Sequence, residues 1–486
     1  MRDVDDFGCH APASSLYFRP DGWVTPCCAS WHLLGRVTGP ERESLRAIWN
    51  GYRSEALRTA VAVGDPSLGC WECGRAAAAG NRASSLAADF DPHRPEPDLG
   101  PRVLDFALSN RCNLECVMCN GGLSSSIRKN RDGRPPLPPA YDDRFFDELA
   151  EMLPGVERTD FKGGEPFLSP ESRRVWDLLI DRPGPPPLVS VTTNGTVWNE
   201  GVAHYVEALA MKVFASVDAM DPDVLRSIRT GIDPQRFWRN VDRFQQISER
   251  TGAPFNLQFC LMAQNWRELR PFLDEADRRG AVPHVIWVDG PRDYSLMGLA
   301  PAHLAEVDAA WSGDPGPTRP SAASAQIWAD ARSRVAGQVA DRAAAPTAVP
   351  VGAPTRRTPT SDRPGARRAL EQLCRPGLIE VQYRNEIVQA VRTQPWAGAL
   401  DPERWIGSGL EELPTLLAVS SGGMLRSDVE VLGKGSYRLD LRLETDPPVT
   451  LIGYYLPDDD QRSGTLLLGA AQAELQVAAE PRAIRV

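Results

Sequence analysis

Residues 109–120 read Ser109-Asn-Arg-Cys112-Asn-Leu-Glu-Cys116-Val-Met-Cys119-Asn120. The segment follows an apolar run, Val103–Leu108, that is typical of a buried strand. Three thiolates with spacings x3 and x2 on one loop can ligate three irons of a four-iron, four-sulfur cubane and leave the fourth iron open. A zinc site is the alternative, but zinc favours paired x2 spacings and four ligands, and no fourth cysteine is near in the sequence.

Short apolar runs alternate with amphipathic stretches over residues 100–290. This alternation predicts an α/β domain with a parallel sheet. The expected strands are Val103–Leu108, Thr159–Lys162, Leu188–Thr193, Lys212–Val217, Asn256–Met262 and His284–Val288. The expected helices between them are Phe145–Leu153, Glu171–Ile180, Pro234–Glu249 and Trp266–Arg279.

Three further motifs follow the next strands in order. They are Lys162-Gly163-Gly164-Glu165-Pro166, Thr192-Thr193-Asn194-Gly195 and Ser216-Val217-Asp218. Each motif alone is common in ordinary turns. Together, CxxxCxxC, GGEP, TNG and SxD at successive strands resemble the radical S-adenosylmethionine (SAM) superfamily, whose core is a partial (β/α)6 TIM-type barrel.

The resemblance implies the cofactor contacts. Cys112, Cys116 and Cys119 would ligate a [4Fe–4S] cluster whose open iron chelates SAM, and the carboxylate of Glu165 would accept the SAM ammonium group. Arg229 matches a position that often pairs with the SAM carboxylate. The other implied cofactor-binding residues are Gly163, Gly164, Pro166, Thr193, Asn194, Ser216, Asp218 and Met118, the last standing where many members carry an aromatic residue beside the adenine.

The N-terminal part of the chain carries a second set of cysteines. Cys9, Cys27, Cys70 and Cys73, with Gly22 at a Gly-x4-Cys spacing from Cys27, are similar to the twitch form of the SPASM domain, which binds an auxiliary [4Fe–4S] cluster. The resemblance implies that these four thiolates saturate the cluster and that Cys28 is not a ligand. A structural zinc site is the alternative that four cysteines also suit. In the families most similar to it the module follows the barrel, whereas here it precedes it.

The composition divides the chain into four segments. Residues 1–90 form the twitch/SPASM-like module, and residues 100–311 form the radical SAM core. Residues 312–366, rich in Pro and Ala, are expected to be a disordered linker apart from a helix at Ala323–Val335. Residues 370–486 are expected to form a β-rich domain of unknown role, with strands at Ser436–Glu444, Val449–Leu456 and Thr465–Leu468.

Charge and hydropathy limit the classes of partner. The formal net charge is −10 and no basic block stands out, so neither nucleic acid nor an anionic membrane surface is expected as a partner. No apolar run approaches the roughly 18 to 20 residues of a membrane span, and the acidic N-terminus lacks the apolar stretch of a signal peptide. We therefore expect a cytoplasmic protein, in which the 10 cysteines serve as metal ligands or thiols rather than disulfides.

Three cysteines remain outside both sets: Cys28, Cys260 and Cys374. A free cysteine is most often a small buried hydrophobic residue. Cys260 has a second interpretation, because it lies in the fifth expected strand. Alternation along the strand places one of two sets inside the barrel, either Gln258, Cys260 and Met262 or Leu257, Phe259 and Leu261. The sequence does not determine which set faces inward.

The resemblance implies that an electron from an external donor, such as a flavodoxin or ferredoxin, drives cleavage of SAM to a 5′-deoxyadenosyl radical that takes a hydrogen atom from the substrate. Three outcomes stay open. The leading hypothesis is oxidation of a hydroxylated, sugar-like metabolite with the auxiliary cluster as electron acceptor, since the four-ligand pattern resembles inosamine dehydrogenase. The second is modification of a ribosomal peptide by crosslinking, thioether formation or epimerisation, with Cys260 as the hydrogen donor of an epimerase. The third is a non-catalytic binding or scaffold protein.

Overall fold

The computed structural model describes residues 7–344, apart from 41, 67, 96–99, 185 and 289–291, together with the strands between residues 424 and 476. The chain divides into two compact units, Met1–Ala348 and Val349–Val486. Both cysteine sets lie in the first unit.

The first unit is built on a nine-stranded sheet. Six neighbouring strands, β4, β6, β7, β8, β10 and β11, run parallel, β1 adds to them in parallel, and β2 and β3 follow antiparallel. This is the predicted α/β architecture. The order across the sheet is β11 (Val282–Trp287), β10 (Phe255–Leu261), β8 (Lys212–Ser216), β7 (Leu188–Thr193), β6 (Arg158–Phe161), β4 (Val103–Phe106), β1 (Ser15–Phe18), β2 (Trp23–Thr25) and β3 (Gly35–Arg36).

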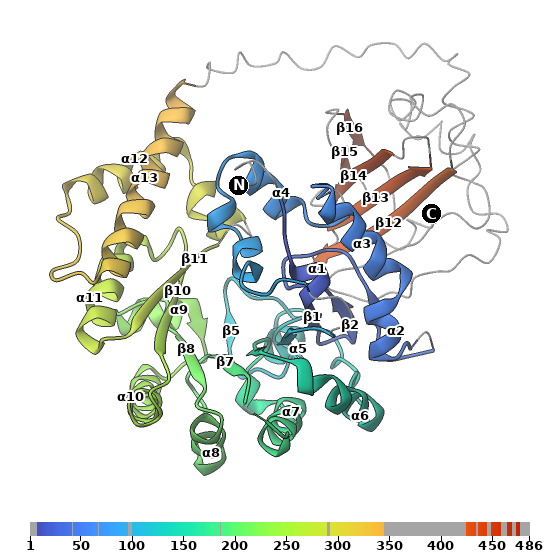
Figure 1. The fold of residues 1–486 in the computed structure, drawn as a ribbon. Coiled ribbons are helices and arrows are strands. Elements are labelled where there is room, and N and C mark those ends of the chain that lie inside the picture. The colour runs from blue at the N-terminus through green and yellow to red at the C-terminus, as the bar shows by residue number, and fades with distance from the viewer. Residues whose placement is uncertain are drawn as a thin grey trace, which may run out of the picture. The chain divides into compact units, whose positions relative to one another are not determined.

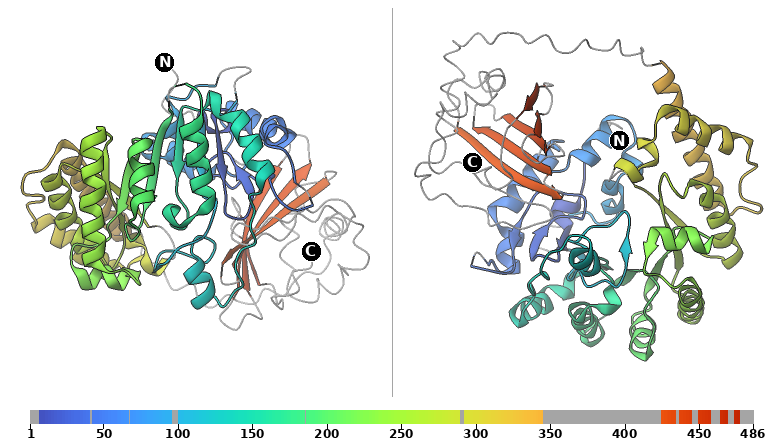
Figure 2. Two further views of the ribbon diagram at one scale, coloured as in Figure 1. Left: turned by 90° about the horizontal axis from the view of Figure 1, so that it is seen from below. Right: turned by 180° about the vertical axis from the view of Figure 1, so that it is seen from behind.

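Helices cover the outer side of the curved sheet (Figures 1 and 2). Polar side chains at their N-termini accept hydrogen bonds from backbone N–H groups that no helical carbonyl can reach; Asp142, Ser169, Asn199 and Asp233 do this for four of them. The helices that follow the strands are α6 (Asp143–Met152), α7 (Pro170–Asp181), α8 (Glu200–Ala208), α9 (Pro222–Ile228), α10 (Pro234–Thr251) and α11 (Leu269–Arg279).

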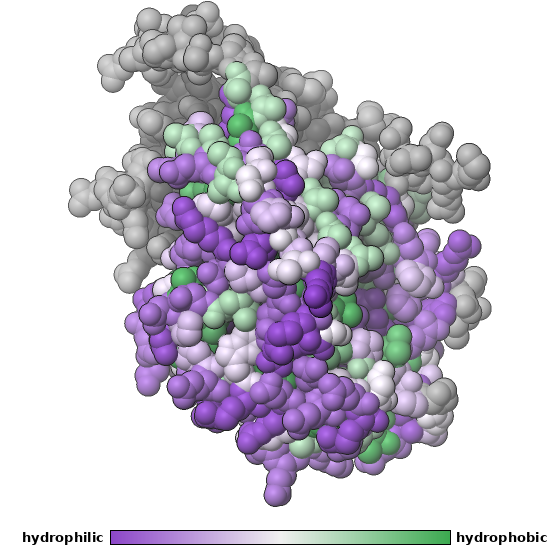
Figure 3. Space-filling model, turned by 90° about the vertical axis from the view of Figure 1, so that its left-hand side faces the viewer, coloured by the Kyte–Doolittle hydropathy of each residue, from purple (hydrophilic) through white to green (hydrophobic). Residues whose placement is uncertain are grey.

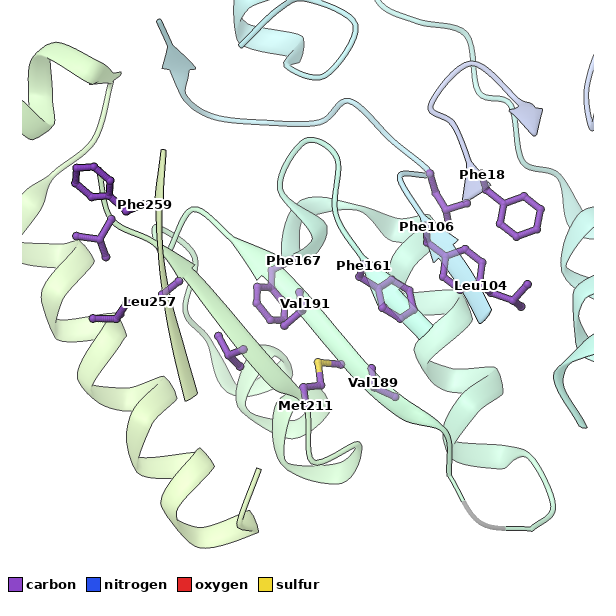
Figure 4. Packing of buried hydrophobic residues seen from close by; sticks show 14 of the residues in the cluster. Phe18, Leu104, Phe106, Phe161, Phe167, Val189, Val191, Met211, Leu257 and Phe259 are labelled. Carbon is purple, nitrogen blue, oxygen red and sulfur yellow. The ribbon is translucent and has the colours of Figure 1, made fainter. Parts of the chain in front are cut away.

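The outward face of the sheet forms the hydrophobic core. Phe18, Phe106 and Phe161 occupy paired positions on three neighbouring strands, and their rings stack with centroids 5.3 Å and 5.0 Å apart (Figure 4). Trp176 of α7 and Phe145 of α6 pack edge-on against this row. Because side chains alternate along a strand, the residues that precede and follow each of these phenylalanines on its own strand point to the inner face.

The inner face carries polar side chains. Tyr17, Asp105, Asp160, Ser190 and Lys212 are successive partners across five strands and therefore form one row. Most of the inner-facing residues on β6, β7 and β8 keep some exposed surface, whereas their outward neighbours are buried. A polar, partly accessible surface thus lines the concave side of the sheet.

The N-terminal region shares this sheet. It contributes β1, β2 and β3, with helices α1 (Ala11–Ser14), α2 (Leu45–Asn50), α3 (Tyr52–Ala62) and α4 (Trp71–Ala78). β1 pairs with β4 over four residues. The sequence predicts a module over residues 1–90; in the structure this region joins the barrel through backbone hydrogen bonds, a pairing with no signature in a single sequence.

The expected linker boundary at residue 312 needs correction. Helices α12 (Pro301–Gly313) and α13 (Ala322–Ala344) belong to the first unit, and the predicted helix at 323–335 is longer than expected. The ring centroids of Trp311 and Trp328 are 5.7 Å apart, and Val335 is fully buried. The Ala-rich composition that suggested a linker encodes a helix here, because enough large apolar residues fall on one side to bury it. Residues 345–366 lie outside the described part.

The second unit contains a five-stranded antiparallel sheet whose strands follow chain order. The strands are β12 (Met424–Gly433), β13 (Ser436–Glu444), β14 (Val449–Pro457), β15 (Gly464–Leu468) and β16 (Ala473–Gln476). The three predicted strands correspond to β13, β14 and β15. Cys374 lies outside the described residues.

Among the helices that the structure describes, none is long and apolar enough to cross a membrane. On the face shown in Figure 3, hydrophilic residues predominate in the lower part, and hydrophobic residues are more frequent in the upper part.

Candidate functional site

The three core cysteines lie on a loop that leaves the end of β4 and is held in place by many hydrogen bonds. The amide of Asn110 donates to the carbonyl of Gly121 at 3.0 Å, which closes the loop across the cysteines. Ser124 caps α5 (Ser125–Asn130) and donates to the carbonyl of Leu114 at 2.7 Å, and Ser126 donates to the carbonyl of Cys112 at 2.8 Å. The backbone around the thiols is thereby fixed by the chain itself.

Burial shifts the chemistry of these thiols. Desolvation raises the pKa of Cys116 to about 11 and that of Cys119 to about 12, and the pKa of Cys112 is raised as well. The negative charges of neighbouring thiolates add to the shift for Cys116 and Cys119. Three such thiols together favour a bound cation that takes the place of the protons, which is the donor set that an iron–sulfur cluster needs.

The GGEP turn follows β6 and faces this loop. Gly163 and Gly164 have φ of +79° and +58°, and a Cβ on Gly164 would lie 2.5 Å from the carbonyl oxygen of Arg111. The backbone of Glu165 donates to the same carbonyl at 2.7 Å. Glycine is therefore required where the turn meets the cysteine loop. Pro166 begins the short helix Pro166–Leu168.

Glu165 is a fully buried carboxyl group at the centre of the site. Its oxygens accept hydrogen bonds from the Thr193 hydroxyl at 2.9 Å and from the Asn194 N–H at 2.7 Å. Burial nevertheless raises its pKa to about 7, since these hydrogen bonds offset only part of the desolvation. A carboxylate so placed gains from a positively charged partner.

Asn194 joins the TNG turn to the cysteine loop. Its side-chain N–H lies 3.7 Å from the Cys112 sulfur and 3.0 Å from the Asn113 side-chain oxygen. Thr196 also contacts Asn113. The structure therefore brings together Cys112, Glu165 and Asn194 from the ends of three neighbouring strands.

Ser216 is the last residue of β8 and Asp218 follows the strand; both are buried. Arg229, for which the sequence predicts a contact with the SAM carboxylate, pairs with Asp218 in this structure, with nitrogen and oxygen 2.7 Å apart. Its other terminal nitrogen is 3.9 Å from the Cys116 sulfur. The spacing of the motifs carries no information on this pairing, which depends on how α9 returns to the cysteine loop. Met118 packs against the core from the loop itself.

Cys260 faces the inner side of the sheet. Its neighbours Leu257, Phe259 and Leu261 are fully buried on the outer side, where Phe259 contacts Phe272 of α11. The N–H of Cys260 donates to Asp218 at 2.8 Å, and burial, then the Asp218 charge, raise the pKa of its thiol. The structure thus resolves the parity that the sequence left open.

The four N-terminal cysteines line one pocket. Cys9, Cys27, Cys70 and Cys73 surround it with apolar neighbours that include Phe7, Pro12, Pro26, Leu86 and Phe90. Burial raises the pKa of Cys9 to about 11 and of Cys70 to about 12, and raises those of Cys27 and Cys73. The donors and their apolar surroundings suit a cluster held by four thiolates.

Cys28 lies outside this pocket lining and turns toward the barrel. The Lys162 ammonium is 3.5 Å from the Cys28 sulfur and 2.7 Å from an Asp105 oxygen. Burial raises the pKa of Asp105 to about 6, although Lys162 acts against the shift. Adjacent cysteines thus face two different sites.

Sequence reasoning missed these inner-face residues and the hydroxyls that hold the loop. The sequence offered two signals. Asp105 is a charged residue in the middle of the first expected strand, Val103–Leu108, and Lys162 directly precedes the paired glycines. Their meaning depends on which face of the strand they occupy.

Comparison with known families agrees with this geometry. Residues 106–257 match the radical SAM superfamily, and residues 9–74 match the iron–sulfur cluster-binding domain SPASM. A probable GTP 3′,8-cyclase of Halobacterium salinarum is 33% identical over 141 residues, which are 27% of this chain and 36% of that protein. An AdoMet-dependent heme synthase of Methanosarcina barkeri is 24% identical over 188 residues, 38% of this chain and 50% of that protein. The chain spans well under two thirds of the length of either relative.

Solved structures with similar regions include anSMEcpe with bound AdoMet (TM-score 0.34, 18% identity, 43% of this chain and 58% of that one). Another is Streptococcus suis SuiB bound to the precursor peptide SuiA (TM-score 0.30, 14% identity, 57% of this chain and 53% of that one). From the two family matches, residues 106–257 belong to the radical SAM superfamily, and residues 9–74, ahead of the barrel, belong to the SPASM iron–sulfur cluster-binding domain.

Proposed function

We propose that this enzyme oxidises a polar, hydroxylated small molecule by radical chemistry. The observation that carries the proposal is the convergence of Cys112, Glu165 and Asn194, from three strand ends, around the loop of three buried thiols. When bound, SAM and its cluster supply a 5′-deoxyadenosyl radical that removes a substrate hydrogen atom, and the auxiliary cluster supplies an electron acceptor.

Different residues of the chain would bind SAM and each of the two clusters. Cys112, Cys116 and Cys119 would hold the first cluster, and Glu165 would accept the SAM ammonium group. Cys9, Cys27, Cys70 and Cys73 would hold the second. Four ligands leave no open position for substrate, so the second site suits electron transfer.

The inner face of the sheet supports a polar substrate without a large negative charge. Two of its cations are already paired with aspartates: Lys162 with Asp105 at 2.7 Å and Arg158 with Asp160 at 2.8 Å. A nucleoside triphosphate such as GTP would need several cations that are not already neutralised. Lys212 on the same face contacts the ring of Phe214 and not a carboxylate, and one such cation does not match a triphosphate. Paired donors and acceptors suit hydroxyl groups, which both donate and accept.

The test is anaerobic reconstitution followed by mass spectrometry with a panel of cyclitols, aminocyclitols, hexoses, GTP and a short peptide. We expect one polyhydroxylated compound to lose two hydrogens per 5′-deoxyadenosine formed. Turnover of GTP, or of the peptide and no polyol, would contradict the proposal.

Lys162→Met sharpens this test. The variant should weaken polyol-dependent formation of 5′-deoxyadenosine at least about tenfold, the loss expected for one charge-assisted hydrogen bond. Lys212→Met is the matched control, because Lys212 lies on the same face but contacts the ring of Phe214 rather than a carboxylate. Equal losses in both variants would show that Lys162 has no special part in binding.

Epimerisation is a second candidate, favoured by the inward orientation of Cys260. An epimerase must return a hydrogen atom to the substrate radical, and a thiol on the inner face is a suitable donor. Cys260→Ala in deuterated water should then abolish epimerisation together with deuterium incorporation at the reacting carbon, measured by mass spectrometry. Unchanged epimerisation with unchanged label would eliminate this thiol as the donor.

A further inference from the structure

A buried arginine is held against one of the three core thiols. Cys116 and Arg229 are backbone partners in the two-stranded ribbon of β5 (Glu115–Cys116) and β9 (Arg229–Thr230), and the N–H of Val117 donates to the carbonyl of Ile228 at 2.9 Å. The Arg229 side chain then turns back so that one nitrogen lies 3.9 Å from the Cys116 sulfur. Only 6% of this side chain is exposed.

Asp218 fixes the arginine from the other side. Its carboxylate has no exposed surface and pairs with Arg229 at 2.7 Å. The second carboxylate oxygen accepts the N–H of Cys260, and the Asp218 carbonyl accepts the side-chain amide of Asn265 at 2.8 Å. The ion pair is therefore anchored to the end of β10 and cannot simply rotate away from the cysteine.

The three core thiols consequently stand in different electrostatic surroundings. The side-chain neighbours of Cys112 include the neutral amide of Asn194 and the carboxyl group of Glu165. Arg131 donates to the backbone carbonyl of Cys119, but its side chain is 41% exposed, so water screens its charge. Among the described residues, Arg229 is the buried cation directed at a core sulfur.

We propose that Asp218 and Arg229 set the reduction potential of the SAM-binding cluster through Cys116. The inference rests on the proposed function, because it takes Cys116 to be a cluster ligand. Reduction adds negative charge to a cluster, and both nearby charge and hydrogen bonds to its sulfurs shift the potential. In a buried site a fixed cation favours the reduced state and a fixed anion opposes it. The two members of one ion pair therefore act with opposite signs.

The experiment is an EPR-monitored redox titration of the reconstituted full-length protein. The SAM-binding cluster is identified as the signal that changes when SAM is added, which separates it from the auxiliary cluster. Arg229→Gln should lower the ratio of reduced to oxidised cluster at least about tenfold at a fixed potential, equivalent to about 59 mV for one electron. Asp218→Asn, which keeps an oxygen for the N–H of Cys260, should shift the ratio the other way.

Arg131→Gln is the control and should shift the titration less than Arg229→Gln. A purely structural ion pair predicts shifts of the same sign in Arg229→Gln and Asp218→Asn, or no shift in either, and both results would overturn the inference. If Arg229→Gln does not retain its iron, Asp218→Asn decides alone: no rise in the potential rejects the proposal. A wild-type protein without a SAM-responsive signal would instead contradict the proposed function.

Discussion

Glu165 combines complete burial with three hydrogen bonds and no cationic partner within hydrogen-bonding distance among the described residues. Its pKa of about 7 is a consequence, because burial disfavours the charged form more than the hydrogen bonds favour it. Between the ordinary carboxyl pKa and about 7 the folded chain binds more protons than the unfolded chain, so this group lowers stability as the pH rises through that window. A ligand ammonium group would reverse that effect.

We therefore predict that SAM binding tightens between pH 6 and pH 8 as Glu165 ionises. Glu165→Gln should bind SAM roughly tenfold or more weakly at pH 8, the loss of a charge-assisted hydrogen bond, and should lose the pH dependence. Equilibrium dialysis of reconstituted protein measures both. Glu200→Gln, at an exposed position in the first turn of α8, is the control; a pH dependence that survives in Glu165→Gln would assign the titration to another group.

Residue identity and spacing predicted which cysteines belong together, because thiols carry a specific chemistry. They did not predict the partners of Arg229, Lys162 and Asp105. Those contacts depend on strand parity and on chain returns that no local pattern encodes. Cys260 shows the limit most clearly, since one residue of register would have turned it into the outer core.

At the scale of elements, the turns after the strands carry the site. Gly164 adopts a left-handed backbone at the point where the GGEP turn touches the carbonyls of Ser109 and Arg111. Any side chain there would push the cysteine loop away from Glu165. The turn thus positions the thiols as well as the expected ligand contact.

Gly164→Ala should lower stability and also cost the first cluster. The left-handed backbone alone costs a non-glycine residue about 1 to 2 kcal/mol, and displacement of the loop should remove roughly four of the eight irons that two clusters require. Iron analysis and thermal unfolding report the two effects separately. Gly280→Ala is the matched control, because Gly280 is also left-handed but has no atom within 4 Å of the added Cβ. If Gly164→Ala keeps its full iron content, the turn does not position the loop.

Long periodic elements were predictable, and all six core strands occur where the apolar runs indicate them. Short ones were not: α5, β5 and β9 form because the cysteine loop folds onto α9, and two residues of strand carry no pattern. Helix α13 was predicted over Ala323–Val335, where its large buried residues lie, but its last turns up to Ala344 were assigned to the linker because their composition is rich in Ala.

At the scale of the whole first unit, both cysteine sites are built on one continuous sheet. β1 pairs with β4, the strand that leads into the core cysteine loop, and Cys27 and Cys28 connect the auxiliary pocket to the barrel side. An electron acceptor held this way has a fixed position relative to the inner face, which suits the proposed oxidation.

Replacing Cys9, Cys27, Cys70 and Cys73 together with Ser should remove about half of the roughly eight irons. SAM cleavage should continue, whereas oxidation of the substrate should stop, because the electron acceptor is gone. Iron content, 5′-deoxyadenosine and oxidised product are measured in the same samples. Cys28→Ser is the control and should keep all its iron; loss of iron from that variant, or zinc in the auxiliary site, would refute the assignment of ligands.

The most direct test of the central claim is the formation of 5′-deoxyadenosine by a variant with Cys112, Cys116 and Cys119 all changed to Ala. After anaerobic reconstitution and chemical reduction, we expect this variant to keep about half the wild-type iron, retained by the auxiliary site, and to cleave no SAM. Cleavage of SAM by this triple variant at the wild-type rate would contradict the assignment of these three thiols to the radical-forming cluster.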